Sequence, residues 1–414
     1  MELWGWVSEL RDFGSLRFII LRKGEDFFQI TLKKKELPEK VFRKFDSLTK
    51  ESIISVEGKK RKSERARNGW ELIPSKIEII SKAEQPVPLD ISGKIESGLD
   101  SRLDWRSIDL RTPECQAIFR IKAAVIGYWR EFLDERGFLE VSTPFIMGVP
   151  SESGAEVFPI DYFGKKAFLR QDPQLHRQLT ILGGFEKIYD LGPNWRAEKS
   201  HTTRHVSEYL SCAVEMADIG NEYDVMKIEE EMVRYSLKKL MEGEDFRKFK
   251  IKLLIPKKFP ILEFPEVYEI LEKKGKKFKR GEGIDKESEY LLGEYVKKKY
   301  NSDFFFLNKF PSKTKPFYVM EEGEFARSTD LIFKGMEISS GGQREHRYNE
   351  LVKNIKERRL NPKNLEWFTK FFKYGAPPHG GFAVGVERFV KQLLGLENIR
   401  EAILFPRDVE RLVP

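Results

Sequence analysis

The chain has 414 residues, of which 40% are hydrophobic and 13% aromatic, and its formal net charge is +8. These values exclude a disordered chain and predict two or three packed domains, while the basic balance suits a polyanionic partner such as nucleic acid. Only Cys115 and Cys212 could supply thiolates, so a thiolate zinc site is disfavoured and a reducing compartment is favoured. No apolar run approaches a membrane span and no signal peptide is present, so we expect a cytoplasmic protein without a membrane partner.

Residues 1–82 are predicted to form five short strands with one short helix before the fourth. The expected strands cover residues 4–7, 16–22, 27–32, 53–58 and 72–80, and the helix 38–45. This order is that of an OB-fold, a barrel often used on single-stranded nucleic acid. The side chains that could stack on unpaired bases or hydrogen-bond to them are Arg11, Phe18, Gln29 and Glu71. From the pattern alone, the favoured alternative makes Phe18 a core residue and the other three ordinary surface residues.

Residues 83–112 are predicted to form a hinge, because they contain Pro86 and Pro88 and are rich in polar and turn residues. A catalytic domain is expected over residues 113–414. Its first element is a helix over residues 116–137, with apolar residues at three-then-four spacing and Gly137 as its cap. A second apolar flank on this helix is wide enough to pack against another subunit. This flank consists of Phe119, Trp129 and Leu133.

Residues 151–158 (SESGAEVF) have the composition of a loop that closes over a ligand, and residues 171–178 read QDPQLHRQ. Helical spacing places Gln174 and Arg177 on one face, although an ordinary solvated helix start explains that segment equally well. Strands over 186–191 and 209–216 predict a long hairpin. The charged residues at its mouth are Arg196, Glu198, Lys199, Arg204 and His205. A triphosphate would satisfy these cations, with ion pairing to neighbouring acids as the alternative.

The segment 330–344 is predicted to be a strand that begins at Asp330 and ends at Gly341-Gly342. Asp330, Glu337 and Ser340 offer the hard oxygen ligands that Mg²⁺ takes while it keeps phosphate contacts. Arg344, beyond the glycines, is shaped to bind a carboxylate with two parallel hydrogen bonds. Together these residues indicate that a nucleotide activates an acid. Arg388, at a later strand-to-helix junction, could contact a base or a phosphate, and the two commonest glycine-rich phosphate loops are absent from the sequence.

Six segments in this order resemble the class II aminoacyl-tRNA synthetases, and among them the archaeal-type aspartyl-tRNA synthetases. They are GFLEVSTP, WRAEKSHTTRH, EISSGGQREHRY, KYGAPPHGGF, GFAVGVERF and ILFPRDVERLVP. The resemblance implies an α+β protein with an OB-fold anticodon-binding barrel and a catalytic domain built on an antiparallel sheet flanked by helices. It also implies a homodimer that converts L-aspartate and ATP into aspartyl-adenylate and then charges tRNA(Asp).

The same resemblance assigns roles to individual residues. ATP binding is assigned to Arg196, Ala197, Glu198, Arg204, His205, Val206, Glu337, Gly385, Val386, Glu387 and Arg388. Aspartate binding is assigned to Glu152, Asp172, Gln174, Leu175, His176, Arg177, Arg196, Ser340 and Arg344. Mg²⁺ is assigned to Glu337 and Ser340, with Asp330 beside them, and anticodon reading to Arg11, Phe18, Gln29 and Glu71. Arg196, Glu337 and Arg388 carry the catalytic roles.

Four positions of the amino-acid pocket depart from the family pattern. The family usually has QSPQLYKQ where this chain has QDPQLHRQ, and an aspartate where it has Ala213. We hypothesise that Asp172 supplies the charge that the aspartate at position 213 gives to the substrate ammonium group. Because of these departures, three alternatives stay open. They are a paralogue that activates another amino acid, an adenylate-forming enzyme that makes asparagine, and an RNA-binding paralogue without catalysis. Ser8, where a bulkier residue could stand, leaves charging of tRNA(Asn) open as well.

Overall fold

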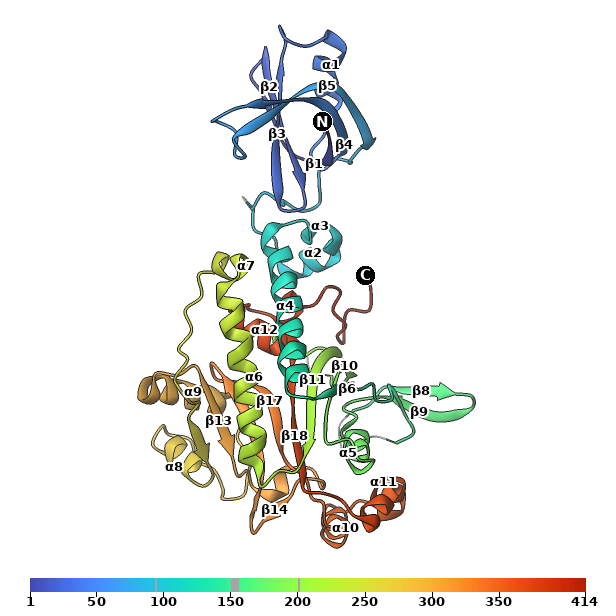
Figure 1. Ribbon diagram of the computed structural model, residues 1–414, viewed down its shortest axis with the longest axis vertical. Helices are drawn as coiled ribbons and strands as arrows, with labels where there is room; N and C mark the ends of the chain where they lie inside the picture. Colours follow the sequence, from blue (N-terminus) through green and yellow to red (C-terminus); the bar gives the residue numbers. More distant parts are fainter. Residues whose placement is uncertain (94, 150–155, 200–201) are drawn as a thin grey trace. The chain divides into compact units, whose positions relative to one another are not determined.

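The computed structural model describes residues 1–93, 95–149, 156–199 and 202–414. Its internal contacts divide the chain into two compact units, Met1–Gln116 and Ala117–Pro414 (Figure 1). The units are described separately below. None of the helices in the described part of the chain has the length and apolar character needed to cross a bilayer.

The first unit is a closed five-stranded barrel with the strand order β1-β2-β3-β5-β4. Its strands are β1 (Glu2–Asp12), β2 (Leu16–Lys23), β3 (Asp26–Lys33), β4 (Ile53–Lys62) and β5 (Trp70–Ser81), with α1 (Glu39–Arg43) and a 3₁₀ turn (Lys44–Ser47) between β3 and β4. Alternate residues such as Ile19, Leu21, Ile30 and Leu72 are fully buried inside it. The predicted OB-fold is therefore confirmed, including the helix before the fourth strand.

The predicted hinge contains two short helices, α2 (Leu99–Asp104) and α3 (Arg106–Asp109). Asp109 accepts hydrogen bonds from Arg102 Nε at 2.9 Å and Arg106 Nη1 at 2.5 Å. Arg106 is only 1% exposed, so charge pairing rather than an apolar stripe organises this segment. The predicted boundaries at residues 82 and 112 stay a prediction.

The second unit is built on an eight-stranded sheet with the order β12-β13-β16-β17-β18-β11-β10-β6. In this order the strands cover Ile261–Glu263, Phe304–Asn308, Ser328–Phe333, Met336–Gln343, His379–Gly385, Glu208–Ala217, Lys187–Trp195 and Leu139–Glu140. The central pairings are antiparallel, as predicted, but β12 with β13 and β6 with β10 run parallel at the two edges. The sheet is therefore mixed.

The predicted strand after Asp330 is in fact a hairpin of β16 and β17. Lys334 and Gly335 both have positive φ, which suits a tight turn between right-twisted strands, and β17 continues through Gly341 and Gly342. A turn inside the apolar run FKGM was not recognised from the sequence. The hairpin register places Asp330 directly opposite Ser340.

Helices α4 (Pro113–Glu135), α6 (Glu222–Glu242) and α12 (Val386–Leu394) enclose the main hydrophobic core with the sheet (Figure 1). Trp129 on α4 packs against Phe389 on α12, with ring centroids 5.2 Å apart, and its Nε1 donates to Ser236 on α6. Trp129 and Leu133 are both fully buried here. The predicted subunit-facing flank of α4 is therefore wrong for these two residues, because the core of their own chain covers them.

Smaller elements complete the second unit. A three-stranded sheet is formed by β7 (Ile146–Met147), β8 (Pro159–Tyr162) and β9 (Lys165–Leu169), and a hairpin by β14 (Glu321–Glu322) and β15 (Phe325–Ala326). The remaining helices are α5 (Gln174–Leu182), α7 (Glu244–Lys248), α8 (Glu266–Glu272), α9 (Lys286–Tyr300), α10 (Tyr348–Glu357) and α11 (Glu366–Thr369), with 3₁₀ turns at Ser312–Thr314, Pro362–Leu365, Lys370–Tyr374 and Ile399–Ala402.

Candidate active site

A cavity of about 870 Å³ opens above the middle strands of the large sheet. It gathers most of the predicted site residues from segments far apart in the chain. Those that line it are Asp172, Gln174, Arg196, Glu198, Arg204, His205, Val206, Glu337, Ser340, Arg344, Gly385, Glu387 and Arg388.

Two glycines allow the strands beneath this cavity to pack closely. A Cβ atom on Gly381 would lie 2.0 Å from the carbonyl oxygen of Val214, and one on Gly341 would lie 2.6 Å from that of Gly381. Because these contacts involve backbone atoms, strands β17, β18 and β11 leave no room for a side chain at either position.

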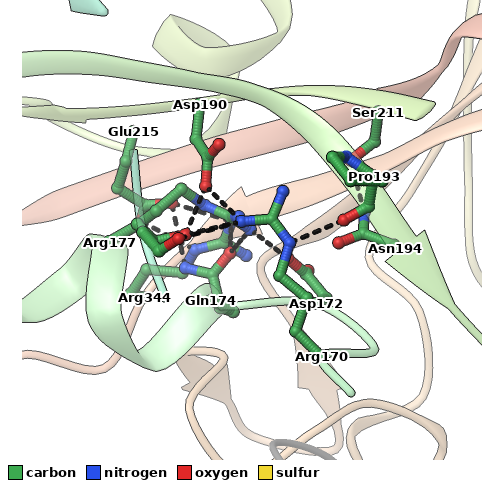
Figure 2. Close-up of polar contacts among 11 residues, drawn as sticks. Arg170, Asp172, Gln174, Arg177, Asp190, Pro193, Asn194, Ser211, Glu215 and Arg344 are labelled. Atoms are coloured by element: carbon green, nitrogen blue, oxygen red, sulfur yellow. Dashed lines mark hydrogen bonds and ion pairs between the residues drawn. The ribbon is translucent and has the colours of Figure 1, made fainter. Parts of the chain in front are cut away.

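Gln174 connects the charged groups at one end of the cavity (Figure 2). Its Nε2 donates to Glu215 at 2.9 Å, and its Oε1 accepts from Arg177 Nη2 at 2.9 Å and Arg344 Nη2 at 3.2 Å. Arg344 also donates from Nε to Glu215 Oε1 at 2.9 Å. Burial disfavours the charged form of Glu215, but Arg344 outweighs it and holds the pKa of this carboxyl below its usual range.

Asp172 and Arg177 form an ion pair in the wall of this end. Arg177 Nη2 lies 2.6 Å from Asp172 Oδ1. The Asp172 side chain is 20% exposed and lines the cavity, whereas that of Arg177 is 1% exposed and does not. The structure therefore places Arg177 behind Asp172 rather than facing a ligand.

Two further residues of α5 that were predicted to bind aspartate also do not line the cavity. Leu175 is fully buried in a separate apolar cluster with Phe317 and Phe368. The His176 ring lies 5.1 Å from that of Trp367. The helical period explains both positions. Gln174 and Arg177 are three residues apart and share one face of α5, whereas Leu175 and His176 lie on other faces of the helix.

Cations dominate the other end of the cavity. Burial and four nearby cations lower the pKa of His205 to about 4, and those cations are Arg388, Lys286, Arg204 and Arg196. Each of the three arginines has one acidic neighbour. Arg196 lies 3.7 Å from Glu198, Arg204 lies 3.2 Å from Glu289, and Arg388 lies 3.6 Å from Glu337. This end can therefore hold a polyanion.

The predicted magnesium ligands divide into wall residues and a supporting residue. Glu337 and Ser340 line the cavity, whereas Asp330 does not. Both Asp330 oxygens lie 3.0 Å from Lys315 Nζ, and Asp330 Oδ1 accepts the Ser340 hydroxyl at 2.7 Å. Because the Ser340 hydroxyl donates its hydrogen bond to Asp330, the lone pairs of its oxygen can accept a cation. One carboxylate and one hydroxyl suit a Mg²⁺ ion that keeps phosphate and water ligands. The described residues contain no group of three or more acidic, histidine or cysteine side chains placed to hold a metal by themselves.

Comparison with known proteins identifies the family. A family model described as class II tRNA synthetases (D, K and N) matches residues 98–409, and an OB-fold nucleic-acid-binding model matches residues 2–80. The chain belongs to the class II aminoacyl-tRNA synthetases.

Similar proteins span the full length of this synthetase. The aspartate–tRNA(Asp) ligase of Pyrococcus horikoshii is 44% identical over 99% of this chain and 95% of its own. The aspartate–tRNA(Asp/Asn) ligase of Methanopyrus kandleri is 42% identical over 100% and 96%. Among solved structures, the asparaginyl-tRNA synthetase of Pyrococcus horikoshii complexed with asparaginyl-adenylate has a TM-score of 0.93 at 33% identity, covering 100% of this chain and 96% of that one. Class II synthetases use ATP and typically Mg²⁺.

The remaining ATP-site predictions concern residues at the edge of this synthetase cavity. Ala197 and Val386 do not line it, and Val386 is fully buried in the main core. Glu387 lines it but is held by Lys122 Nζ at 2.7 Å and the Leu210 amide at 3.0 Å, which gives it a structural part. Glu152 lies outside the described residues.

Sequence reasoning missed several residues that line the cavity. They include Asn194, Ser211, Asp285, Lys286, Glu287, Glu289, Lys315, Tyr318, Asp408 and Val409. Asp285 caps helix α9 by accepting from the Ser288 amide at 2.8 Å, a signal that is readable in the sequence. This capping signal predicts where the helix begins, but it does not predict that the helix lies beside the cavity.

The four predicted anticodon residues lie on adjoining strands of the barrel. Arg11 is opposite Phe18 across β1 and β2, and Gln29 is opposite Glu71 across β3 and β5. Thr31, which is opposite Phe18, donates to Glu71 at 2.5 Å and so connects the two pairs. The structure thus brings the four residues onto one continuous face of the OB-fold.

Proposed function

We propose that this synthetase activates L-aspartate with ATP, releases pyrophosphate, and transfers the aspartyl group to the 3′-terminal adenosine of tRNA(Asp). The observation that carries the proposal is Arg344, which lines the cavity and donates to Glu215 and Gln174 through Nε and Nη2 only. Its Nη1 makes no hydrogen bond with the described residues and is free for a side-chain carboxylate. The 40–44% identity to archaeal aspartate–tRNA ligases supports the same substrate.

The ammonium group of the amino acid has a partner in Asp172. Arg177 engages Asp172 Oδ1, and Oδ2 makes no hydrogen bond with the described residues. Ala213 lies on the same face of β11 as Ser211 and Glu215, where it adds no charge. Asp172 therefore supplies the negative charge that the pocket needs for a zwitterionic substrate.

Bringing the substrate carboxylate to the α-phosphate of ATP means bringing two anions together. Arg196 and Arg388 lower that repulsion, and positioning in line supplies much of the remaining rate, so no general base is required. Glu337 and Ser340 are the residues that would hold Mg²⁺, with Asp330 and Lys315 orienting Ser340. Bound there, the ion would neutralise charge on the phosphate oxygens.

The proposal includes a homodimer that acts in the cytoplasm and an OB-fold that reads the anticodon with Arg11, Phe18, Gln29 and Glu71. The acceptor tRNA(Asn) stays open, because the relatives named above divide between tRNA(Asp) and tRNA(Asp/Asn) ligases. A second candidate, activation of a different amino acid, is favoured by one observation only. This observation is that Asp172 lines the cavity while Ala213, on the same face of β11 as Ser211, carries no charge.

The test is ATP–pyrophosphate exchange with each of the twenty amino acids, followed by charging of tRNA(Asp) and tRNA(Asn) transcripts. We expect exchange with aspartate and at least a hundredfold lower kcat/KM with asparagine, because a neutral amide leaves the Arg344 charge unpaired. Exchange that prefers another amino acid would replace aspartate by that substrate. No exchange with any amino acid would contradict the proposed activity.

A further inference from the structure

Helix α9 contacts the hairpin that carries Glu337 both near its start and at its middle. A Cβ atom on Gly293 of α9 would lie 2.8 Å from the backbone of Gly335, so the helix and the β16–β17 turn touch through their backbones. In addition, the Glu337 amide donates to Glu289 Oε2 at 3.4 Å. These contacts place the start of α9 beside the cationic end of the cavity.

The acidic side chains at the start of helix α9 already have partners. Asp285 lies 3.3 Å from Lys276 Nζ, Glu287 pairs with the same ammonium group, and Glu289 pairs with Arg204. Lys286 differs from them. It lines the cavity but forms no hydrogen bond or ion pair with the residues that the structure describes.

The surroundings of Lys286 are mostly cationic. Partial burial and the charges of Arg204 and Arg388 lower the pKa of its amine, while Glu289 and Glu198 act in the opposite direction. The four charged groups named here all line the same cavity as Lys286. Like charges held this closely are stabilised when a polyanion lies between them.

We propose that Lys286 binds the β- and γ-phosphates of ATP and, in the reverse reaction, pyrophosphate. This inference rests on the proposed function. The α-phosphate must approach the amino acid held near Arg344, so the terminal phosphates lie towards the end formed by Arg204, His205 and Lys286. Lys286 would thus be an ATP-binding residue on helix α9, an element to which the sequence motifs assign no role.

The experiment uses the full-length enzyme with Lys286→Met, Lys286→Arg and, as a matched control on the same helix, Lys297→Met. KM for ATP and for pyrophosphate is measured in the exchange reaction, and KM for tRNA in charging. The dissociation constant is measured for a non-hydrolysable aspartyl-sulfamoyl-adenosine, which lacks the terminal phosphates. Lys286→Met should raise KM for ATP and pyrophosphate about tenfold, the factor for one charge-assisted hydrogen bond. Affinity for the sulfamoyl compound should stay within twofold, and Lys286→Arg should largely restore both KM values.

Three results would overturn the inference. The first is that Lys286→Met leaves KM for ATP and for pyrophosphate unchanged. If KM for tRNA rises in that case, the Lys286 amine binds RNA instead of the terminal phosphates. Another is an equal loss of affinity for ligands with and without terminal phosphates, which would indicate a general distortion. The third is the same change in Lys297→Met. Failure of the proposed function is recognised separately, because the unmodified enzyme would then show no exchange.

Discussion

Asp172 has two different neighbours, a buried guanidinium behind it and the open cavity in front. Arg177 cannot reach a ligand past it, yet Arg177 fixes its carboxylate in one position. A charged group that is held before the substrate arrives loses little entropy on binding. At the residue scale, therefore, Arg177 is a positioning residue and Asp172 the one that would contact the substrate.

Replacing Asp172 by Asn should weaken binding of aspartyl-sulfamoyl-adenosine by roughly 10- to 100-fold, because a charge-assisted hydrogen bond to the ammonium group is lost. The desamino analogue, which carries a succinyl group, should lose less than threefold. Isothermal titration calorimetry measures both affinities, and the exposed Asp161→Asn serves as the control. Equal losses for the two compounds would mean that Asp172 acts only through Arg177.

His205 should take up a proton when ATP binds at mildly acidic pH. Burial and four surrounding cations lower the pKa of its ring to about 4, and a bound triphosphate would offset the charge of the cations and raise the pKa. Between pH 4 and the raised value, binding is then linked to proton uptake. Titrations at pH 5.5 in buffers of different ionisation enthalpy should show more uptake in the unmodified enzyme than in His205→Gln. Equal uptake would contradict this explanation.

At the scale of elements, helix α6 brings a buried acid under the sheet. Glu229 on α6 is fully buried, and burial raises its pKa to about 8, although the nearby Ser339 hydroxyl acts in the opposite direction. Asp330, beyond Ser339 in the next strand, contributes to the rise. Glu229 is therefore neutral in the folded protein at pH 7.

This burial makes stability depend on pH. Between the ordinary glutamate pKa and about 8, the folded protein keeps a proton that the unfolded chain releases, so the free energy of unfolding falls as pH rises. Glu229→Gln should remove that part of the slope and stabilise the protein at pH 8 by about 4 kcal/mol. Denaturant unfolding at pH 5 and pH 8 measures it, with Glu242→Gln, at an exposed position of the same helix, as control. A slope that survives in Glu229→Gln would assign it to other groups.

The elements predicted best are those with local signals. Helix α6 carries such signals, because Asn221 and Asp224 form a capping box ahead of a regular apolar stripe. Helices α2 and α3 were missed because Asp109 and its arginines hold them by charge. The β16–β17 turn was missed because Lys334, with positive φ, is not a typical turn residue.

At the scale of the whole molecule, the net charge of +8 is accompanied by a basic hairpin at the end of β4. It contains Lys59, Lys60, Arg61, Lys62, Arg65 and Arg67. Arg61 is engaged by Glu71, but the three lysines are exposed. In the proposed function these lysines face the phosphates of the tRNA backbone.

Affinity for tRNA should therefore fall steeply with salt, by on the order of tenfold or more between 50 and 200 mM KCl if three or four phosphates are bound. Replacing Lys59, Lys60 and Lys62 by Gln should lower the slope of log Kd against log salt by about 1 for each phosphate that the variant no longer binds. Filter binding at five salt concentrations measures it, and KM for aspartate should not change. An unchanged slope would remove the hairpin from the RNA-binding surface.

The site could be predicted from sequence only where its residues belong to recognisable motifs. Arg196, Glu337 and Arg388 were anticipated in this way, and the structure brings them to one cavity. Lys286 and Lys315 belong to no such motif. Their places depend on long-range packing, such as the close approach of α9 to the hairpin turn, which no local pattern encodes.

The close packing at Gly341 and Gly381 also decides where this enzyme can change in evolution. Any larger residue at these positions would push strands β17, β18 and β11 apart, so random mutagenesis there should return almost only glycine. New amino-acid preferences must then arise from the side chains that line the cavity, such as Asp172, Gln174 and Arg344.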